Sequence, residues 1–116
     1  MIRWLPLACL LALATGCLER KPKPLGAMFD GKVVPVSSAR KGNAGSTVIV
    51  QGTMIEKCPE AGCWFVLRDE SGAIKVDTKD AGFVVVGVPL QVSLTVAGRL
   101  TTNGTERMLA ATGLRY

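Results

Sequence analysis

The sequence predicts an all-β fold, a small five-stranded barrel that follows a signal peptide and a flexible leader. The chain has 116 residues, of which 48% are apolar, so it is long enough for one small packed domain. The β-branched residues Val, Ile and Thr are frequent in its second half, where several runs alternate apolar and polar residues at the period of a strand. No helix-period pattern of useful length follows residue 17.

Five strand-like runs follow one another after residue 45. They are STVIVQGTMIEKC (46–58), CWFVLRD (63–69), GAIKVDTK (72–79), PLQVSLTVAGRL (89–100) and RMLAATGLRY (107–116). The fourth run alternates most regularly, and its apolar face contains Leu90, Val92, Leu94 and Val96. The run at 31–42 is expected to add a further strand. Pro35 confines this strand to the edge of the sheet, because proline has no N–H group to donate to a central ladder.

The spacing of these runs predicts how the strands connect. Five strands with one insertion after the third, DAGFVVVGV (80–88), have the connectivity of an OB-fold barrel. Gly52, in the middle of the long first run, fits the sharp coil that this fold requires in that strand. The predicted domain therefore covers residues 31–116, and a small β-sandwich is the alternative architecture.

The first residues, MIRWLPLACLLALATGC, have the layout of a secretory signal. Arg3 precedes an apolar run over 4–14, which is too short to span a membrane as a mature helix. Small residues then lead to Cys17, and this order resembles a bacterial lipobox, in which the thiol is acylated and becomes the new N-terminus. We therefore predict a signal peptide over 1–16 and a lipid anchor at Cys17. The alternative is an ordinary signal peptide with a chance cysteine.

Residues 17–30 are predicted to be the lipidated N-terminus and a flexible linker. Leu18 replaces the Asp that often retains lipoproteins in the inner membrane, which favours the outer membrane if the cell has one. Prolines alternate with basic residues over 20–24, as is typical of an extended spacer. The same basic residues would also be attracted to anionic headgroups. The expected location is the cell envelope, and the expected partner is the bilayer.

The charge distribution argues against a nucleic-acid partner. Between residues 46 and 116 the chain has seven basic and seven acidic residues, so its net charge of +5 comes from the N-terminal part. A nucleic-acid-binding domain usually has a basic face of its own. An envelope protein is a further possible partner, but the sequence does not identify one.

The stretch CPEAGCWF (58–65) contains the two cysteines that remain after lipidation. In an oxidising compartment, Cys58 and Cys63 are expected to form a disulfide. The first alternative is a soft-metal site for Cu(I) or zinc, with Met54 as a further sulfur ligand, because thiolates bind these ions well. The second is redox catalysis, although thiol–disulfide enzymes usually have two intervening residues at the start of a helix.

The remaining candidates are aromatic. Trp64 and Phe83 are candidate ligand-binding residues, since an exposed ring can stack on a base or a sugar. The alternative is that these rings cover the end of the barrel. The chain has no histidine, and no Gly-rich phosphate motif is present, so neither catalysis nor an organic cofactor is expected.

One segment resembles a known family. The stretch VQGTMIEKCPEAGCWFVLRDESGAIKVDTKDAGFVVV is similar to an uncharacterised family of small secreted bacterial OB-fold proteins with a C-x-x-x-G-C-W motif. The matching positions are Val50, Gly52, Cys58, Gly62, Cys63, Trp64, Leu67, Asp69, Lys79, Asp80, Gly82, Phe83 and Val84. Ala61 and Ala81 replace a basic residue and a tyrosine of that pattern. The resemblance implies the fold and the compartment, and it implies no biochemical activity.

Together these observations predict a membrane-anchored envelope lipoprotein whose OB-fold domain is a non-catalytic binding or structural module. The first alternative function is soft-metal binding through Cys58 and Cys63. The second is binding of a nucleic acid or an oligosaccharide through the barrel surface.

Overall fold

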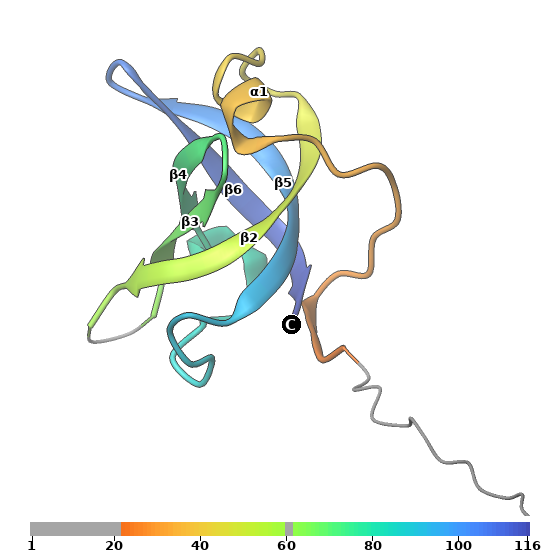
Figure 1. Cartoon of the computed structure of the whole chain (residues 1–116), viewed down its shortest axis with the longest axis vertical. Coiled ribbons are helices and arrows are strands. Elements are labelled where there is room, and N and C mark those ends of the chain that lie inside the picture. The colour runs from red at the N-terminus through yellow and green to blue at the C-terminus, as the bar shows by residue number, and fades with distance from the viewer. Residues whose placement is uncertain (1–21, 60–61) are drawn as a thin grey trace, which may run out of the picture.

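The computed structural model describes residues 22–59 and 62–116 (Figure 1). The predicted signal peptide and Cys17 lie outside the described residues. The elements in chain order are β1 (Pro24–Gly26), α1 (Val36–Arg40), β2 (Thr47–Lys57), β3 (Trp64–Asp69), β4 (Gly72–Asp77), the 3-10 turn η1 (Lys79–Ala81), β5 (Ser93–Asn103) and β6 (Glu106–Arg115). In this part of the chain, no helix is long and apolar enough to cross a membrane.

Five of the strands close into a barrel. The sheet order runs β6-β4-β3-β2-β5, and β5 pairs again with β6. All of these pairings are antiparallel except the one between β4 and β6, which is parallel. This is the connectivity that the order of strands and insertion predicts, so the OB-like barrel is confirmed and the β-sandwich alternative is wrong.

The bend of β2 allows the barrel to close. The first half of β2 pairs with β5 and its second half pairs with β3. Gly52 lies where the strand passes between these partners, and a Cβ atom there would collide with the carbonyl group of Arg68. The strand can coil tightly at this point only because glycine has no side chain. This confirms the role that the sequence predicts for Gly52.

Alternating side chains of the strands fill the barrel. The largest fully buried side chains of the strands are Phe65, Met54, Leu67, Leu94, Leu100, Leu109 and Leu114. Leu94 and Val96 are 1% and 0% exposed, as their alternation predicts. Leu90 is 46% exposed, so its predicted place in the core is wrong. The reason is that β5 begins only at Ser93, after a turn in which Gln91 has a positive φ of 67°.

A short helix closes one end of the barrel. Residues 31–42 do not form the predicted edge strand, because only Val33 makes a bridge, parallel to Ile49. Pro35 then precedes α1 with a φ of −63°, which suits the start of a helix where no N–H partner is needed. Val36 and Ala39 of α1 are buried in the core. The five-residue helix is too short to produce a periodic pattern in the sequence.

Backbone pairing with the barrel begins earlier in the chain than residue 31. Part of the predicted flexible linker forms β1, which pairs with β6 through Pro24 and Arg115. Just before this strand, Lys23 and Tyr116 exchange two backbone hydrogen bonds of 2.7 and 3.0 Å. The linker prediction is therefore wrong for these residues, because backbone pairing with the last strand fixes them.

Candidate functional site

The two cysteines face each other at one end of the barrel. Cys58 directly follows β2 and Cys63 directly precedes β3. Their sulfur atoms are 3.7 Å apart, and the Cys63 thiol donates a hydrogen bond to the Cys58 sulfur. A disulfide bond measures about 2.05 Å, so the structure shows a contacting thiol pair without a covalent bond. The sequence prediction that these residues meet is in accord with this geometry, whereas their oxidation state stays a prediction.

Backbone hydrogen bonds fasten the loop on both sides of this pair. The N–H of Cys58 donates to Trp64 at 2.9 Å, and the N–H of Gly62 donates to the Cys58 carbonyl at 3.3 Å. The connection between β4 and β5 is attached as well, because Thr78 donates to the Cys63 carbonyl and Val85 donates to the Gly62 carbonyl, each at 2.9 Å. The thiol pair is therefore held between two connections that are distant in sequence.

Gly62 occupies a position of this loop that requires glycine. Its φ is +62°, a conformation that other residues rarely adopt. A Cβ atom at this position would also lie 2.5 Å from the backbone nitrogen of Val86. Any side chain would thus push the 85–88 segment away from the cysteine loop. The glycine of the CxxxGC pattern is explained by this close approach.

Lys57 is a residue of this site that sequence reasoning missed. Its ammonium group donates to the backbone carbonyls of Val85 at 3.3 Å, Val86 at 3.1 Å and Val88. These bonds use the three donors of the ammonium group and attach the connection to the end of β2. No sequence signal distinguishes Lys57 from a solvated lysine, since its partners are carbonyl groups about thirty residues further along the chain.

The pKa of the Cys63 thiol is raised above its usual value. The hydrogen bond to Cys58 stabilises the neutral thiol, and desolvation and the charge of Cys58 act in the same direction. A backbone hydrogen bond and the charge of Lys79 oppose this effect but are weaker. Cys63 therefore remains a thiol at neutral pH, whereas thiol–disulfide enzymes depend on a cysteine whose pKa is lowered.

Met54 does not join the thiols. It is fully buried, and it lies in β2 opposite Leu67, four residues before Cys58. An extended strand rises about 3.3 Å per residue, which places the Cα atoms of Met54 and Cys58 roughly 13 Å apart. The described residues contain no cluster of three or more His, Cys, Asp or Glu side chains that could bind a metal ion. The chain thus offers two thiolates to a metal, and Met54 fills the core.

The two candidate aromatic rings lie against other parts of the chain. Trp64 is half-buried, and the Lys75 ammonium lies 4.7 Å from the centre of its ring. Phe83 packs against the backbone of β1, where a Cβ atom on Gly26 would come within 2.6 Å of its ring. Packing partners therefore cover part of each ring, as the alternative hypothesis expects. Ligand binding through Trp64 and Phe83 stays a prediction.

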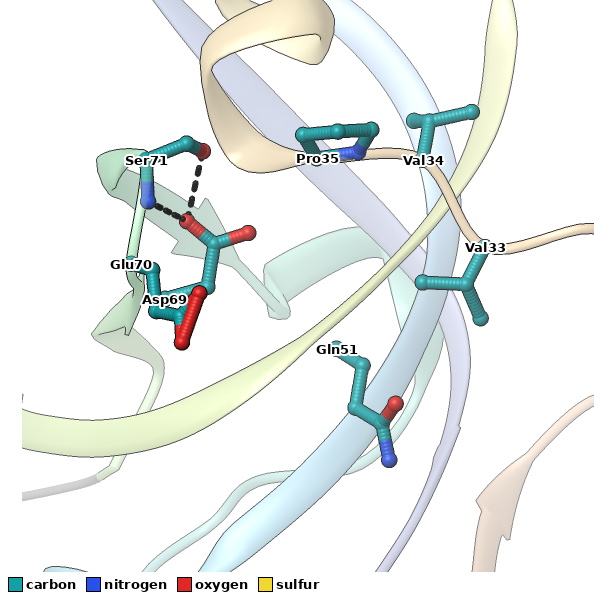
Figure 2. Close-up of a pocket in the computed structure, with 7 residues that line it drawn as sticks. All are labelled: Val33, Val34, Pro35, Gln51, Asp69, Glu70 and Ser71. Atoms are coloured by element: carbon teal, nitrogen blue, oxygen red, sulfur yellow. Dashed lines mark hydrogen bonds between the residues drawn. The ribbon is translucent and has the colours of Figure 1, made fainter.

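An open groove of about 410 Å³ lies at the opposite end of the barrel (Figure 2). It is lined by Val33, Val34, Pro35, Gln51, Asp69, Glu70 and Ser71. Asp69 accepts hydrogen bonds from Ser71 and Gly72 with one oxygen and from the N–H of Val36 with the other. Its carboxylate is therefore committed to joining α1 and the β3–β4 turn.

Partial burial of Asp69 opposes its ionisation, but the hydrogen bonds to it have the larger combined effect. The Ser71 hydroxyl and the N–H groups of Val36, Ser71 and Gly72 together lower the pKa of Asp69 below its usual value. The same carboxylate therefore joins the β3–β4 turn to the helix that closes the barrel.

Comparison with known proteins supports the fold alone. No protein-family model matches the chain, and no curated protein sequence matches it. Among solved structures, the hypothetical protein YgiW from E. coli is similar, with a TM-score of 0.59 and 22% sequence identity. The match covers 73% of this chain and 89% of that one. The chain is therefore similar to YgiW in its small β-barrel fold.

Proposed function

We propose that this protein is a membrane-anchored lipoprotein of the cell envelope. In this proposal its barrel is a non-catalytic binding or structural module. The loop between Cys58 and Cys63 is the distinguishing site of the module, and it forms a disulfide clip in the resting protein. The observation that supports the clip is the contact of the two sulfurs at 3.7 Å between two segments joined by backbone hydrogen bonds.

The surroundings of the thiols favour a clip over a catalyst. The raised pKa of Cys63 makes it a weak nucleophile at neutral pH. The oxidant would be a disulfide of an oxidising thiol protein in the envelope. One cysteine thiolate attacks that disulfide and forms a mixed disulfide, the second cysteine then displaces the carrier, and the carrier leaves as a dithiol. Two thiol protons are released to solvent or to the carrier in this exchange.

The anchor is inferred from the sequence around Cys17. The fold then limits how far the barrel can lie from that anchor. Five residues lie between Cys17 and Lys23, which is fastened to Tyr116 at the end of the last strand. At a maximum of about 3.5 Å for each step from one Cα atom to the next, this segment spans roughly 20 Å. Acyl chains on Cys17 would therefore keep the barrel at the membrane surface.

Replacement of the acylated cysteine tests the anchor. Cys17→Ser should leave an unprocessed, unacylated precursor and abolish the mature membrane-bound form. Cys9→Ser is the matched control, because Cys9 lies in the predicted signal peptide, and it should be processed normally. Membrane fractionation and the mass of the recovered chain measure both outcomes. Normal processing and membrane recovery of the Cys17→Ser protein would sink the lipoprotein proposal.

A soft-metal site is the second candidate function, because the two sulfurs lie close enough together to share one ion. At a metal–sulfur distance of about 2.3 Å, two thiolates in tetrahedral geometry lie about 3.8 Å apart, close to the observed 3.7 Å. A tetrahedral zinc ion would need two further ligands, whereas a linear two-thiolate Cu(I) site would need no further ligand but would require the sulfurs to move further apart. Because Cys63 must lose its proton to bind a metal, affinity should rise with pH.

Titration of the reduced protein with Cu(I) tests this candidate. Equimolar binding that is lost in Cys63→Ser and kept in Met54→Leu would support a two-thiolate site. Loss of binding in Met54→Leu would restore methionine as a ligand, and absence of binding to the reduced native chain would remove the metal function.

Binding of a nucleic acid or an oligosaccharide remains the weakest candidate. The ring of Trp64 is already in contact with Lys75, and the barrel has no excess of basic residues. A titration that leaves Trp64 fluorescence unchanged would exclude stacking on this ring.

A further inference from the structure

Most of the exposed large apolar side chains in the described residues belong to one connection of the chain. In the described part of the chain, those most exposed are Met28 (91%), Val33 (42%), Val84 (44%), Val86 (57%) and Leu90 (46%). Three of them belong to the connection between η1 and β5. A backbone hydrogen bond from Val85 to Gly62 attaches this connection to the segment before Cys63. Such a concentration of exposed apolar side chains marks a contact with a protein or with a membrane.

This connection lies at the barrel end where the leader joins the domain. Phe83 packs directly against Gly26 of β1, so the connection and the leader touch. Figure 1 shows β1, the C-terminus, the end of β2 and the β4–β5 connection at the lower end of the barrel. Helix α1 and the β5–β6 hairpin lie at the other end. We call Met28, Val84, Val86 and Leu90 the anchor-side surface.

Cationic and aromatic side chains accompany this surface. The Arg115 guanidinium lies 4.4 Å from the centre of the Phe29 ring, and the Lys23 ammonium lies 5.8 Å from that of Tyr116. A small apolar hollow of about 60 Å³ beside them is lined by Pro24, Ala27, Met28, Phe29, Leu114 and Arg115. Basic groups beside aromatic and aliphatic ones are the composition that favours the headgroup region of an anionic bilayer.

The tether brings this surface to the bilayer. The segment from Cys17 to Lys23 spans at most about 20 Å whatever its conformation. It joins the barrel at β1, where Gly26 approaches the ring of Phe83, at the start of the connection that contains Val84, Val86 and Leu90. An acylated Cys17 therefore places this end nearer to the membrane than the end closed by α1.

We propose that the anchor-side surface rests in the headgroup region of the bilayer that anchors Cys17. The proposal rests on the lipoprotein function proposed above and adds an orientation to it. The barrel stands with the Cys58–Cys63 loop towards the membrane and the β5–β6 hairpin towards the aqueous space. Any thiol carrier or metal donor then reaches the cysteine pair along the membrane surface.

Depth-dependent fluorescence quenching tests the orientation in the full lipidated chain. The native mature protein has Trp64 as its single tryptophan, so Trp64→Phe supplies a silent background. Val86→Trp in this background reports from the anchor-side surface, and Val84→Trp is a second probe if the first misfolds. Thr105→Trp, at the exposed tip of the opposite hairpin, is the matched control.

The proteins are placed in phosphatidylglycerol-containing vesicles whose acyl chains are brominated near the headgroups. We expect the emission of the Val86→Trp protein to fall about twofold, because interfacial side chains lie within roughly 5–10 Å of the acyl boundary. The emission of the Thr105→Trp protein should be unchanged. Equal quenching of the two proteins, each measured relative to its emission in unbrominated vesicles, would overturn the orientation. Photo-crosslinking in cells from a benzophenone amino acid placed at position 86 to another protein would replace the bilayer by a protein partner.

The mass of the same samples separates this inference from the anchor itself. An acylated Val86→Trp protein whose emission is unquenched keeps the lipoprotein function and overturns the orientation. The same protein without acyl chains but with quenched emission overturns the anchor and keeps the membrane-contacting surface. Absence of both acyl chains and quenching overturns both proposals.

Discussion

Asp69 connects two parts of the chain through the two oxygens of one carboxylate. It accepts hydrogen bonds from the β3–β4 turn and from Val36 at the start of α1. Its pKa is lowered in the folded protein because the ionised form accepts these bonds better. A lowered pKa means that the ionised carboxylate stabilises the folded protein at pH values above the pKa that Asp69 has in the unfolded chain, near pH 4. That contribution is lost as the pH falls through the folded value.

Asp69→Asn should therefore destabilise the domain at neutral pH by about 1–2 kcal/mol, the usual effect of losing a charged hydrogen-bond acceptor at a helix start. The difference from the native protein should begin to shrink below about pH 4, where the carboxyl of the unfolded chain takes up a proton, and should be lost once the pH falls through the lowered pKa of Asp69 in the folded protein. Urea unfolding at several pH values measures this effect, with Glu70→Gln as the neighbouring control. A difference that is the same at pH 7 and pH 3 would contradict the role of the charge.

The cysteine pair has a local role at the same scale. A disulfide between Cys58 and Cys63 closes a very short loop, so it removes only about 2 kcal/mol of unfolded-state entropy. Reduction should therefore leave the barrel folded and change the emission of Trp64, whose backbone carbonyl is bonded to Cys58. Circular dichroism and fluorescence with and without reductant measure the two effects. Cooperative unfolding on reduction alone would show that the clip stabilises the whole fold.

Strand β5 has the largest share of buried side chains among the elements that close the barrel, and it pairs with both β2 and β6. Its predicted apolar face is partly correct. Leu94 and Val96 point into the core, but the residues before Ser93 leave the strand. The alternation of apolar residues continues through a turn there, and periodicity alone does not reveal where a strand ends.

The two leucines of this region supply a matched pair of substitutions. Leu94→Ala should lower the free energy of unfolding by about 2–5 kcal/mol, because it leaves a cavity in the core. Leu90→Ala should change it by no more than about 0.5 kcal/mol, because Leu90 is an exposed residue of a turn. Chemical denaturation of both variants measures the difference. Similar midpoints for the two would show that the core does not depend on Leu94.

The elements that sequence reasoning missed are those without a repeating pattern. The five barrel strands each have an alternating run, and their order predicts the barrel correctly. Helix α1 has five residues and β1 has three, so neither is long enough to show a period. Their positions depend on partners far along the chain, such as Arg115 for β1, and no local signal in the sequence identifies such partners.

The whole molecule joins its leader, its last strand and the cysteine loop at one end. The proximity of Cys58 and Cys63 could be predicted, because four intervening residues in a turn permit little else. The clamp by Lys57 and the contact of Phe83 with Gly26 could not, because both join segments that the fold alone brings together. At this scale, the proposed anchor, the proposed clip and most of the exposed apolar side chains would share one side of the barrel.

The most direct test of this account is the intact mass of the native mature protein, measured after unfolding in an alkylating reagent without reductant. We predict a chain that begins at Cys17 with acyl chains attached, that is short by two hydrogens and that contains no alkyl group on Cys58 or Cys63. An unacylated chain would contradict the anchor. Two alkyl groups on the cysteines would contradict the clip, and stoichiometric release of a metal in that sample would establish the metal site in its place.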